Sequence, residues 1–352
     1  MTDVVEGRRR QRWWAAGGAI AGLLLLAWAL RNFDPWRFLD IVTGATVWPL
    51  LILPLAIIAE QILRAIKWRQ LIYSLRAVGI GRLFGALMAG YFANMVTPVR
   101  VSPLVRAWLV ARLEGLSVST LLATIVFERL IDGLVFVGFA GLALLVIRFP
   151  DPDSNIIQGV AWGTGGSLVA FAALIGMLVA LRREKGRNLL AGLVTRLTAR
   201  LPEKWRHRGV DLAHLFVDGI IWPSAPWRGG VIIASAVVIK IIAISHFLWV
   251  GLAFGVVLGW ADYLFIMVFL SFLVILAGTL RIIGGVAAGA VFVLQGFGID
   301  VETALAMTLL VQAASILTVA FCGAAALWLQ GVSLSAVLAA GKDQSDKGRR
   351  DD

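Results

Sequence analysis

Three ionisable residues, Glu128, Arg129 and Asp132, lie within five positions of an apolar segment. As a helix, the run from Thr120 to Ile147 is about 40 Å long, enough to cross the ~30 Å hydrocarbon core of a bilayer. Charges at that depth face a protein interior or a wet cavity. Glu128 and Asp132 share a helix face, and the spacing also predicts a pair between Arg129 and Asp132. Two close carboxylates in a medium of low polarity do not both ionise readily, so we expect one to be protonated or to need a second cation.

A second set of chemical groups surrounds the dipeptide Ser102-Pro103. Arg100 and Arg106 flank it, and guanidinium groups bind phosphate through two parallel hydrogen bonds. The dipeptide is also placed to open a helix over 104–113, whose free backbone N–H groups favour an anion. We therefore predict a phosphate-binding role for both arginines, near Glu128 and Asp132. Two alternatives are a buried ion-pair knot that holds this segment against the helix, and ordinary basic loop residues.

Other basic residues of the same region receive a simpler interpretation. We interpret Arg64, Lys67, Arg69 and Arg112 as cytoplasmic loop charges, because basic residues gather in such loops.

The second half of the chain offers fewer candidates. Lys240 and His246 lie in the apolar run 231–258, where Lys240 needs a partner or a long reach to the interface. His246 is a satisfied hydrogen-bonding residue or, alternatively, a proton relay. Arg281 stands beside Gly284-Gly285, which interrupts an apolar segment, so we include these three residues as further candidates.

Motifs for metal, nucleotide or nucleophile chemistry do not occur in the sequence. HExxH, a phosphate-binding loop and Cys/His ligand spacing are missing, and Cys322 is the only cysteine. We expect no metal, no cofactor and no enzymatic activity.

Composition limits the class of protein that can position these groups. The chain has 352 residues, of which 60% are hydrophobic and 15% charged, and its mean hydropathy is +0.88. A soluble protein carries more charge than this. The formal net charge of +11 comes from basic residues in short segments between apolar runs, which favours a membrane protein rather than a nucleic-acid-binding one.

The fold class that we predict is an all-α polytopic membrane protein, a single integral membrane domain over 1–352. About six runs are long enough to span, and two interrupted runs are interpreted as re-entrant hairpins. The predicted spans are 14–30, 47–63, 120–147, 157–181, 231–258 and 304–329, and the predicted hairpins are 83–113 and 263–297.

Charge bias predicts that both termini are cytoplasmic. Basic residues concentrate in predicted inner segments, whereas the predicted outer loops hold only Arg31, Arg37 and Arg148. Several tryptophans near segment ends are expected to anchor at the membrane interface. They are Trp13, Trp36, Trp48, Trp68, Trp222 and Trp260.

The order of spans and hairpins predicts an inverted repeat, a recurring plan of transporters. The first repeat is 1–150 and the second 151–335, followed by a disordered charged tail over 336–352. Between the repeats, 182–229 is predicted to form a cytoplasmic loop with an amphipathic helix in the membrane plane.

Several motifs between residues 64 and 135 resemble one known family. They are Arg64-Ala-Ile-Lys-Trp68, Gly90-Tyr-Phe-Ala-Asn94-Met-Val-Thr-Pro98-Val-Arg100, Arg106-Ala107 and Phe127-Glu128-Arg129-Leu-Ile-Asp132. In order and spacing they are similar to the lysylphosphatidylglycerol synthase transmembrane family, also described as flippase-like. The resemblance implies an inner-membrane protein of bacterial or archaeal type that handles lipids with anionic or glycosylated head groups. It assigns the substrate-binding role to Asn94, Arg100, Arg106, Glu128, Arg129 and Asp132.

The sequence departs from the family pattern in three places. Ser102-Pro103 stands where the family has Gly-Glu, the segment 284–288 lacks the family's Pro and Glu, and Gln312 replaces an Arg. We therefore expect a divergent, stand-alone member without the aminoacyl-transfer domain.

The function that these observations predict is transport of an anionic phospholipid or polyprenyl/glycolipid head group between leaflets. Its partners would be lipids with phosphate-bearing head groups. The alternative is a non-transporting scaffold or accessory subunit of a cell-envelope lipid or glycan enzyme. A membrane-embedded transferase that uses Glu128 or Asp132 as its base is the third hypothesis.

Overall fold

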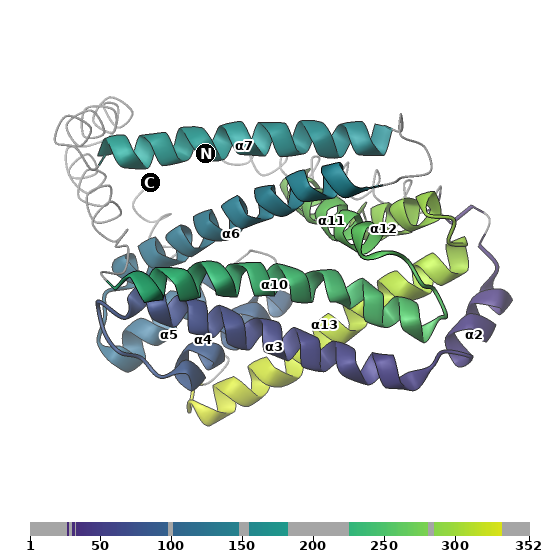
Figure 1. The fold of residues 1–352 in the computed structure, drawn as a ribbon. Coiled ribbons are helices and arrows are strands. Elements are labelled where there is room, and N and C mark those ends of the chain that lie inside the picture. Colours follow the sequence, from purple (N-terminus) through teal and green to yellow (C-terminus); the bar gives the residue numbers. More distant parts are fainter. Residues whose placement is uncertain are drawn as a thin grey trace, which may run out of the picture. The chain divides into compact units, whose positions relative to one another are not determined.

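The structure is a computed structural model that describes residues 27, 30, 31, 33–97, 101–147, 155–181, 225–280 and 285–332. These residues form helices and no strand (Figure 1). The helices are α2 (Pro35–Thr43), α3 (Val47–Ile72), α4 (Ile80–Val96), α5 (Ser102–Glu114), α6 (Val118–Val146), α7 (Asn155–Leu181), α10 (Pro226–Ala253), α11 (Trp260–Leu280), α12 (Gly285–Gly296) and α13 (Val301–Leu329).

Four described helices, α3, α6, α10 and α13, are long and apolar enough to cross a membrane. They match four of the predicted spans, and α7 covers a fifth, 157–181. The predicted span 14–30 lies almost wholly outside the described residues, as do the amphipathic loop 182–229 and the tail 336–352. The protein is thus an all-α polytopic membrane protein, as the sequence predicts.

The chain forms two compact units, and each is assembled from three separate segments. Unit 1 contains Met1–Ile57, Phe136–Gly166 and Ile241–Ser315, and unit 2 contains Ile58–Val135, Ser167–Lys240 and Ile316–Asp352. Each unit draws on both predicted repeats, and the inverted repeat itself stays a prediction.

Unit 1 has an apolar core built on α11, α12 and the first half of α13. Leu264, Phe265, Val291 and Met307 are fully buried in it. The backbone N–H of Thr46, just before α3, donates to the carbonyl of Ala253 at the end of α10, with an N–O distance of 2.8 Å. The start of α3 and the end of α10 therefore lie together.

Unit 2 has a second core, in which α4 and α5 pack against α3 and the first part of α6. Leu83, Leu87, Leu109 and Leu121 are fully buried there. The core also buries charged residues, which form the candidate site.

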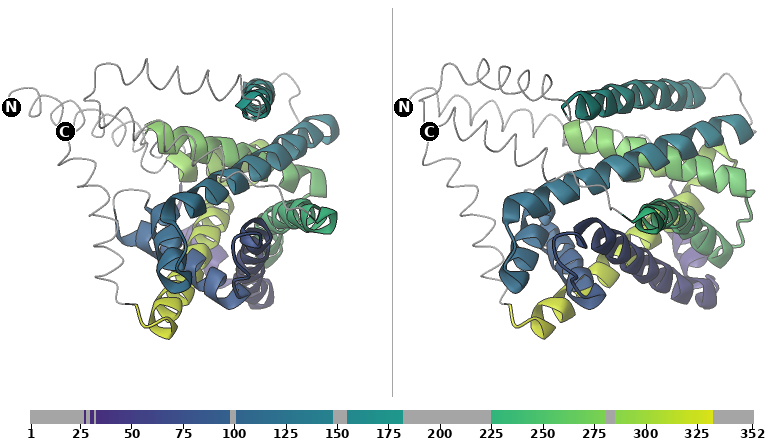
Figure 2. Two further views of the ribbon diagram at one scale, coloured as in Figure 1. Left: turned by 90° about the vertical axis from the view of Figure 1, so that its left-hand side faces the viewer. Right: turned by 60° about the vertical axis from the view of Figure 1, so that its left-hand side comes forward.

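Two pairs of described helices pack closely, α4 with α5 in unit 2 and α11 with α12 in unit 1, and Figure 2 shows the latter pair side by side. A glycine allows close approach in both. A Cβ added at Gly90 would lie 2.9 Å from Ser102 Oγ, and one added at Gly289 would lie 2.0 Å from Leu273 Cδ2. The two predicted hairpins therefore form as helical pairs, and their entry into a membrane from one side stays a prediction.

Candidate functional site

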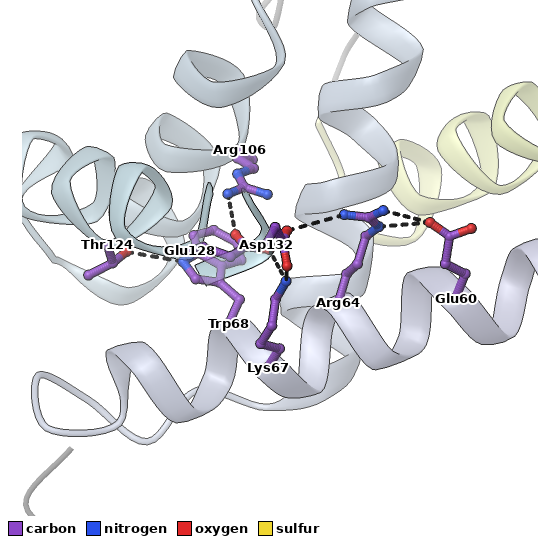
Figure 3. Close-up of polar contacts among 8 residues, drawn as sticks. All are labelled: Glu60, Arg64, Lys67, Trp68, Arg106, Thr124, Glu128 and Asp132. Carbon is purple, nitrogen blue, oxygen red and sulfur yellow. Dashed lines mark hydrogen bonds and ion pairs between the residues drawn. The ribbon is translucent and has the colours of Figure 1, made fainter. Parts of the chain in front are cut away.

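Charged side chains from α3, α5 and α6 meet inside unit 2 (Figure 3). Lys67 and Glu128 are fully buried, and Arg106 is 1% exposed. Charged residues are almost never buried to this degree unless they are paired.

The pairing follows a linear order of alternating charge. Arg106 Nη2 lies 2.5 Å from Glu128 Oε2. Lys67 Nζ lies 3.5 Å from Glu128 Oε1 and also donates a hydrogen bond to Asp132 Oδ1. A single lysine therefore bridges the two carboxylates of α6.

The order continues along α3. Arg64 Nη1 is 3.7 Å from Asp132 Oδ2, and Arg64 Nη2 is 2.6 Å from Glu60 Oε1. Three anions and three cations thus form one neutral series, which we call the ion chain: Glu60, Arg64, Asp132, Lys67, Glu128 and Arg106.

Helical periodicity explains why these residues meet. Glu60, Arg64 and Lys67 recur at intervals of four and three and therefore share one face of α3. Glu128 and Asp132 likewise share one face of α6. The second cation expected for the two carboxylates comes from α3.

Trp68 packs beside the ion chain and contacts one of its cations, Arg106. Its indole N–H donates to Thr124 Oγ1 at 3.1 Å, and the Arg106 guanidinium carbon lies 4.8 Å from the centre of its ring. Aromatic faces attract cations in this geometry. Trp68 is fully buried, so the prediction that it anchors at the membrane interface is wrong.

Asn94 acts on the start of α5. Its Oδ1 accepts a hydrogen bond from the backbone N–H of Ser102 at 2.8 Å. That N–H is one of the four that the first turn of a helix leaves without a partner. The helix predicted from 104 begins at Ser102, and Asn94 already binds one of the amides expected to favour an anion.

Arg129 differs from its neighbours on α6. It is exposed, and within the described part of the chain it forms no ion pair. The predicted pair between Arg129 and Asp132 is therefore wrong. Asp132 points instead to α3, where Lys67 and Arg64 bind it.

The interpretation of Arg64 and Lys67 as loop charges is also wrong. The predicted span ended at residue 63, whereas α3 continues to Ile72, so both residues lie within the helix. The sequence did carry a signal for them, because Glu60 and Arg64 have the spacing of a helical ion pair.

The remaining candidates fall in different places. Lys240 lies on α10 in unit 2, where the charges of Asp132 and Glu60 act on it, whereas His246 lies further along α10 in unit 1. Gly285 is buried at the start of α12. Arg100, Arg281 and Gly284 lie outside the described residues.

The ion chain retains some binding capacity. Arg106 Nε, Glu128 Oε1 and Asp132 Oδ2 are buried and make no hydrogen bond within the described residues. One donor, Arg106 Nε, thus remains for an anionic oxygen of a ligand, and two carboxylate oxygens remain for a hydroxyl group. The described residues contain no group of three or more His, Cys, Asp or Glu side chains placed to hold a metal ion.

Comparison with known families tests the resemblance noted in the sequence. The family described as "Lysylphosphatidylglycerol synthase TM region" matches residues 14–323. The chain belongs to this family. The match covers every helix of the ion chain.

One curated relative is the Glycosyltransferase AglD of Haloferax volcanii. It is 29% identical over 208 residues, which cover 51% of this chain and 32% of the relative. The match thus spans about a third of the relative's length. No solved structure matches the chain.

Proposed function

We propose that this family member moves lipids with a phosphate-bearing head group between the leaflets of the membrane. The observation that carries the proposal is the buried ion chain, because ionised groups inside membrane-spanning helices are costly and mark substrate pathways in many transporters. Family membership supports a role in lipid or glycan biosynthesis.

The charges suggest how a head group would bind. Arg129 is exposed on α6, one residue from Glu128, and we assign it the first contact with the phosphate. Arg106 Nε, which lacks a hydrogen bond within the described residues, would then donate to a phosphate oxygen while Glu128 holds the other edge of the guanidinium. Lys67 and Asp132 would position Glu128. Arg100 and Arg281 remain proposed contacts.

The proposal includes an orientation in the membrane. The protein would lie in the inner membrane of a bacterial or archaeal cell, with both termini cytoplasmic. The hairpins α4–α5 and α11–α12 would be re-entrant, as in transporters with broken helices near the membrane centre.

Lipid binding and lipid movement test the proposal together. Native mass spectrometry of purified protein identifies a retained lipid, and proteoliposomes made with a fluorescent analogue of that lipid report its transfer between leaflets. Arg129→Ala should lose both the lipid and the transfer. Arg112→Ala is the matched control, since Arg112 is an exposed arginine of unit 2 that stacks on Trp108 at 5.4 Å.

The variant must also fold. If Arg129→Ala still elutes from size-exclusion chromatography as a single species and its lipid transfer is unchanged, the transport proposal is wrong. Recovery of transfer in Arg129→Lys would support a role for the charge itself.

A second candidate function is a scaffold or accessory subunit for an envelope lipid or glycan enzyme. The neutrality of the ion chain favours it, because six mutually paired charges also serve to hold helices together. The name of the relative in Haloferax volcanii points to glycan chemistry. Copurification of an enzyme from membranes, lost on deletion of 190–215 while lipid binding persists, would favour this candidate.

A membrane-embedded transferase is less well supported. A general base must reach the proton that it removes, and both carboxylates of α6 are bound by cations. The absence of enzymatic activity stays a prediction.

A further inference from the structure

α2 is a short helix of unit 1 that exposes apolar side chains. Trp36 is 77% exposed and Leu39 is 50% exposed. Phe38 instead packs toward the unit 1 core and contacts the ring of Phe33 at 5.5 Å. The helix therefore has an inner apolar face and a separate outer apolar edge.

Polar residues limit that outer edge. At 100° per residue, Leu39 lies about 60° to one side of Trp36. Asp40 lies about 40° and Arg37 about 100° to the other side, and both charged residues are exposed. A helix with an apolar side, a charged side and a tryptophan between them is typical of the membrane–water interface.

Hydrogen bonds fix α2 to the end of a membrane-spanning helix. The backbone N–H of Asp34 donates to Glu302 Oε1 at 3.0 Å, and Glu302 lies in the first turn of α13. Arg37 lies 3.8 Å from Asp300 and 3.9 Å from Glu302. The Asp34 carboxylate also caps α2 by accepting from the backbone N–H of Trp36.

Other features of unit 1 at this level are typical of the surface of a bilayer. α3 begins at Val47, four residues after α2 ends, and the residue before it is bonded to the end of α10. Exposed tryptophans, Trp48 and Trp260, mark the starts of α3 and α11. Indole rings concentrate where spans leave the hydrocarbon. Figure 1 shows α2 beyond the first turns of α3 and α13.

We propose that α2 is an interfacial anchor whose outer edge, Trp36 and Leu39, inserts between lipid head groups. Charge indicates the class of lipid. Four carboxylates (Asp34, Asp40, Asp300, Glu302) lie on or beside α2, against two arginines, Arg31 and Arg37. An anionic surface would be repelled, so the partner is a zwitterionic lipid surface and burial of apolar area drives the contact.

Site-directed spin labelling measures the depth of α2 directly. In a Cys322→Ala background, which removes the only native cysteine, the variants Trp36→Cys, Leu39→Cys and Arg37→Cys are labelled and placed in phosphatidylcholine nanodiscs. Collision with oxygen, which dissolves in lipid, is compared with collision with a water-soluble nickel chelate. Arg37 is the matched control because it is exposed on the same helix, about 100° from Trp36 and about 160° from Leu39.

The proposal predicts that labels at 36 and 39 collide several-fold more with oxygen than with nickel, and that the label at 37 shows the reverse. Preference for nickel at all three positions would place α2 in water and overturn the proposal. Shielding of 36 and 39 from both reagents would mean that protein covers them, which also overturns it. Insertion that requires added phosphatidylglycerol would contradict the assignment to zwitterionic lipid.

Discussion

Unit 2 buries the ion chain inside its helices, whereas the described charged residues of unit 1 lie in or beside the short helix α2 or at the starts of α11 and α13. In unit 2, Lys67, Arg106 and Glu128 are at most 1% exposed. In α11 and α13 of unit 1, the carboxylates Asp262 and Glu302 lie in first turns. Removing one member of a fully buried pair leaves an uncompensated charge. In unit 1, Glu302 is buried but its partner Arg37 is 59% exposed, so water can take the place of the ion pair at the arginine. Substitution of a charged residue should therefore change the free energy of unfolding much more in unit 2 than in unit 1.

The largest effect is expected for Glu128→Ala in unit 2. The substitution leaves Arg106 without its anion and Lys67 with Asp132 alone, and we expect a loss of about 3–5 kcal/mol of stability. Thermal unfolding in detergent, followed by size-exclusion chromatography, measures it.

A double variant sharpens this prediction. Arg106→Met with Glu128→Leu removes both charges of the pair and should recover much of the lost stability. Wild-type stability in Glu128→Ala alone would remove the distinction between the units.

An effect of intermediate size is expected for Trp68→Phe, which changes the indole that packs beside the ion chain. It removes the hydrogen bond to Thr124, and we expect a loss of about 1–2 kcal/mol. Thr124→Val is the partner variant, and a double-mutant cycle isolates the interaction. Additive effects in the cycle would show that the indole acts by packing alone.

Glu302→Gln tests the charged end of unit 1. The amide oxygen can still accept from the N–H of Asp34, and only the ion pair with the exposed Arg37 is lost. We expect a change of about 1 kcal/mol or less in the free energy of unfolding. A loss as large as that of Glu128→Ala would break the comparison.

The smallest effect is expected from the pH dependence of Asp300. Burial alone would raise the pKa of its carboxyl group, but hydrogen bonds from Thr303 and the charge of Arg37 outweigh it and lower the pKa below its ordinary value of 3.8. The ionised Asp300 carboxylate therefore stabilises the folded protein above pH 3.8, and this stabilisation is lost as the pH falls through the lowered pKa.

Asp300→Asn should therefore reduce the loss of stability between pH 4 and lower values, as measured by unfolding temperature against pH. The effect should be small, since the side chain is 38% exposed. Asp40→Asn, an exposed carboxylate of α2 without an ion pair in the described residues, is the control. Identical acid profiles for Asp300→Asn and the wild type would contradict the prediction.

Prediction from the sequence succeeded where the signal is local. Long apolar runs gave four of the membrane-spanning helices, because a bilayer of fixed thickness demands such runs. The four-residue spacing of Glu128 and Asp132 correctly predicted that they share one face of a helix. Their closeness also predicted that a second cation must bind them.

Prediction failed where a contact depends on a distant segment. Hydropathy placed Arg64 and Lys67 in a loop, because charged residues lower the local average hydropathy. The average contains no information on the carboxylate of α6 that binds both side chains. The local spacing likewise suggested Arg129 as the partner of Asp132, although the α3 cations bind it instead.

The sequence by itself determined that this chain spans a membrane as helices, and that charged groups must lie within it. Only the tertiary structure decided which charges neutralise one another. Lys67 and Asp132 are 65 residues apart, and their pairing exists because α3 and α6 present matching faces in one packed unit. Arg129, one residue from Glu128, is left exposed for the same geometric reason, since its direction on α6 differs by about 100°.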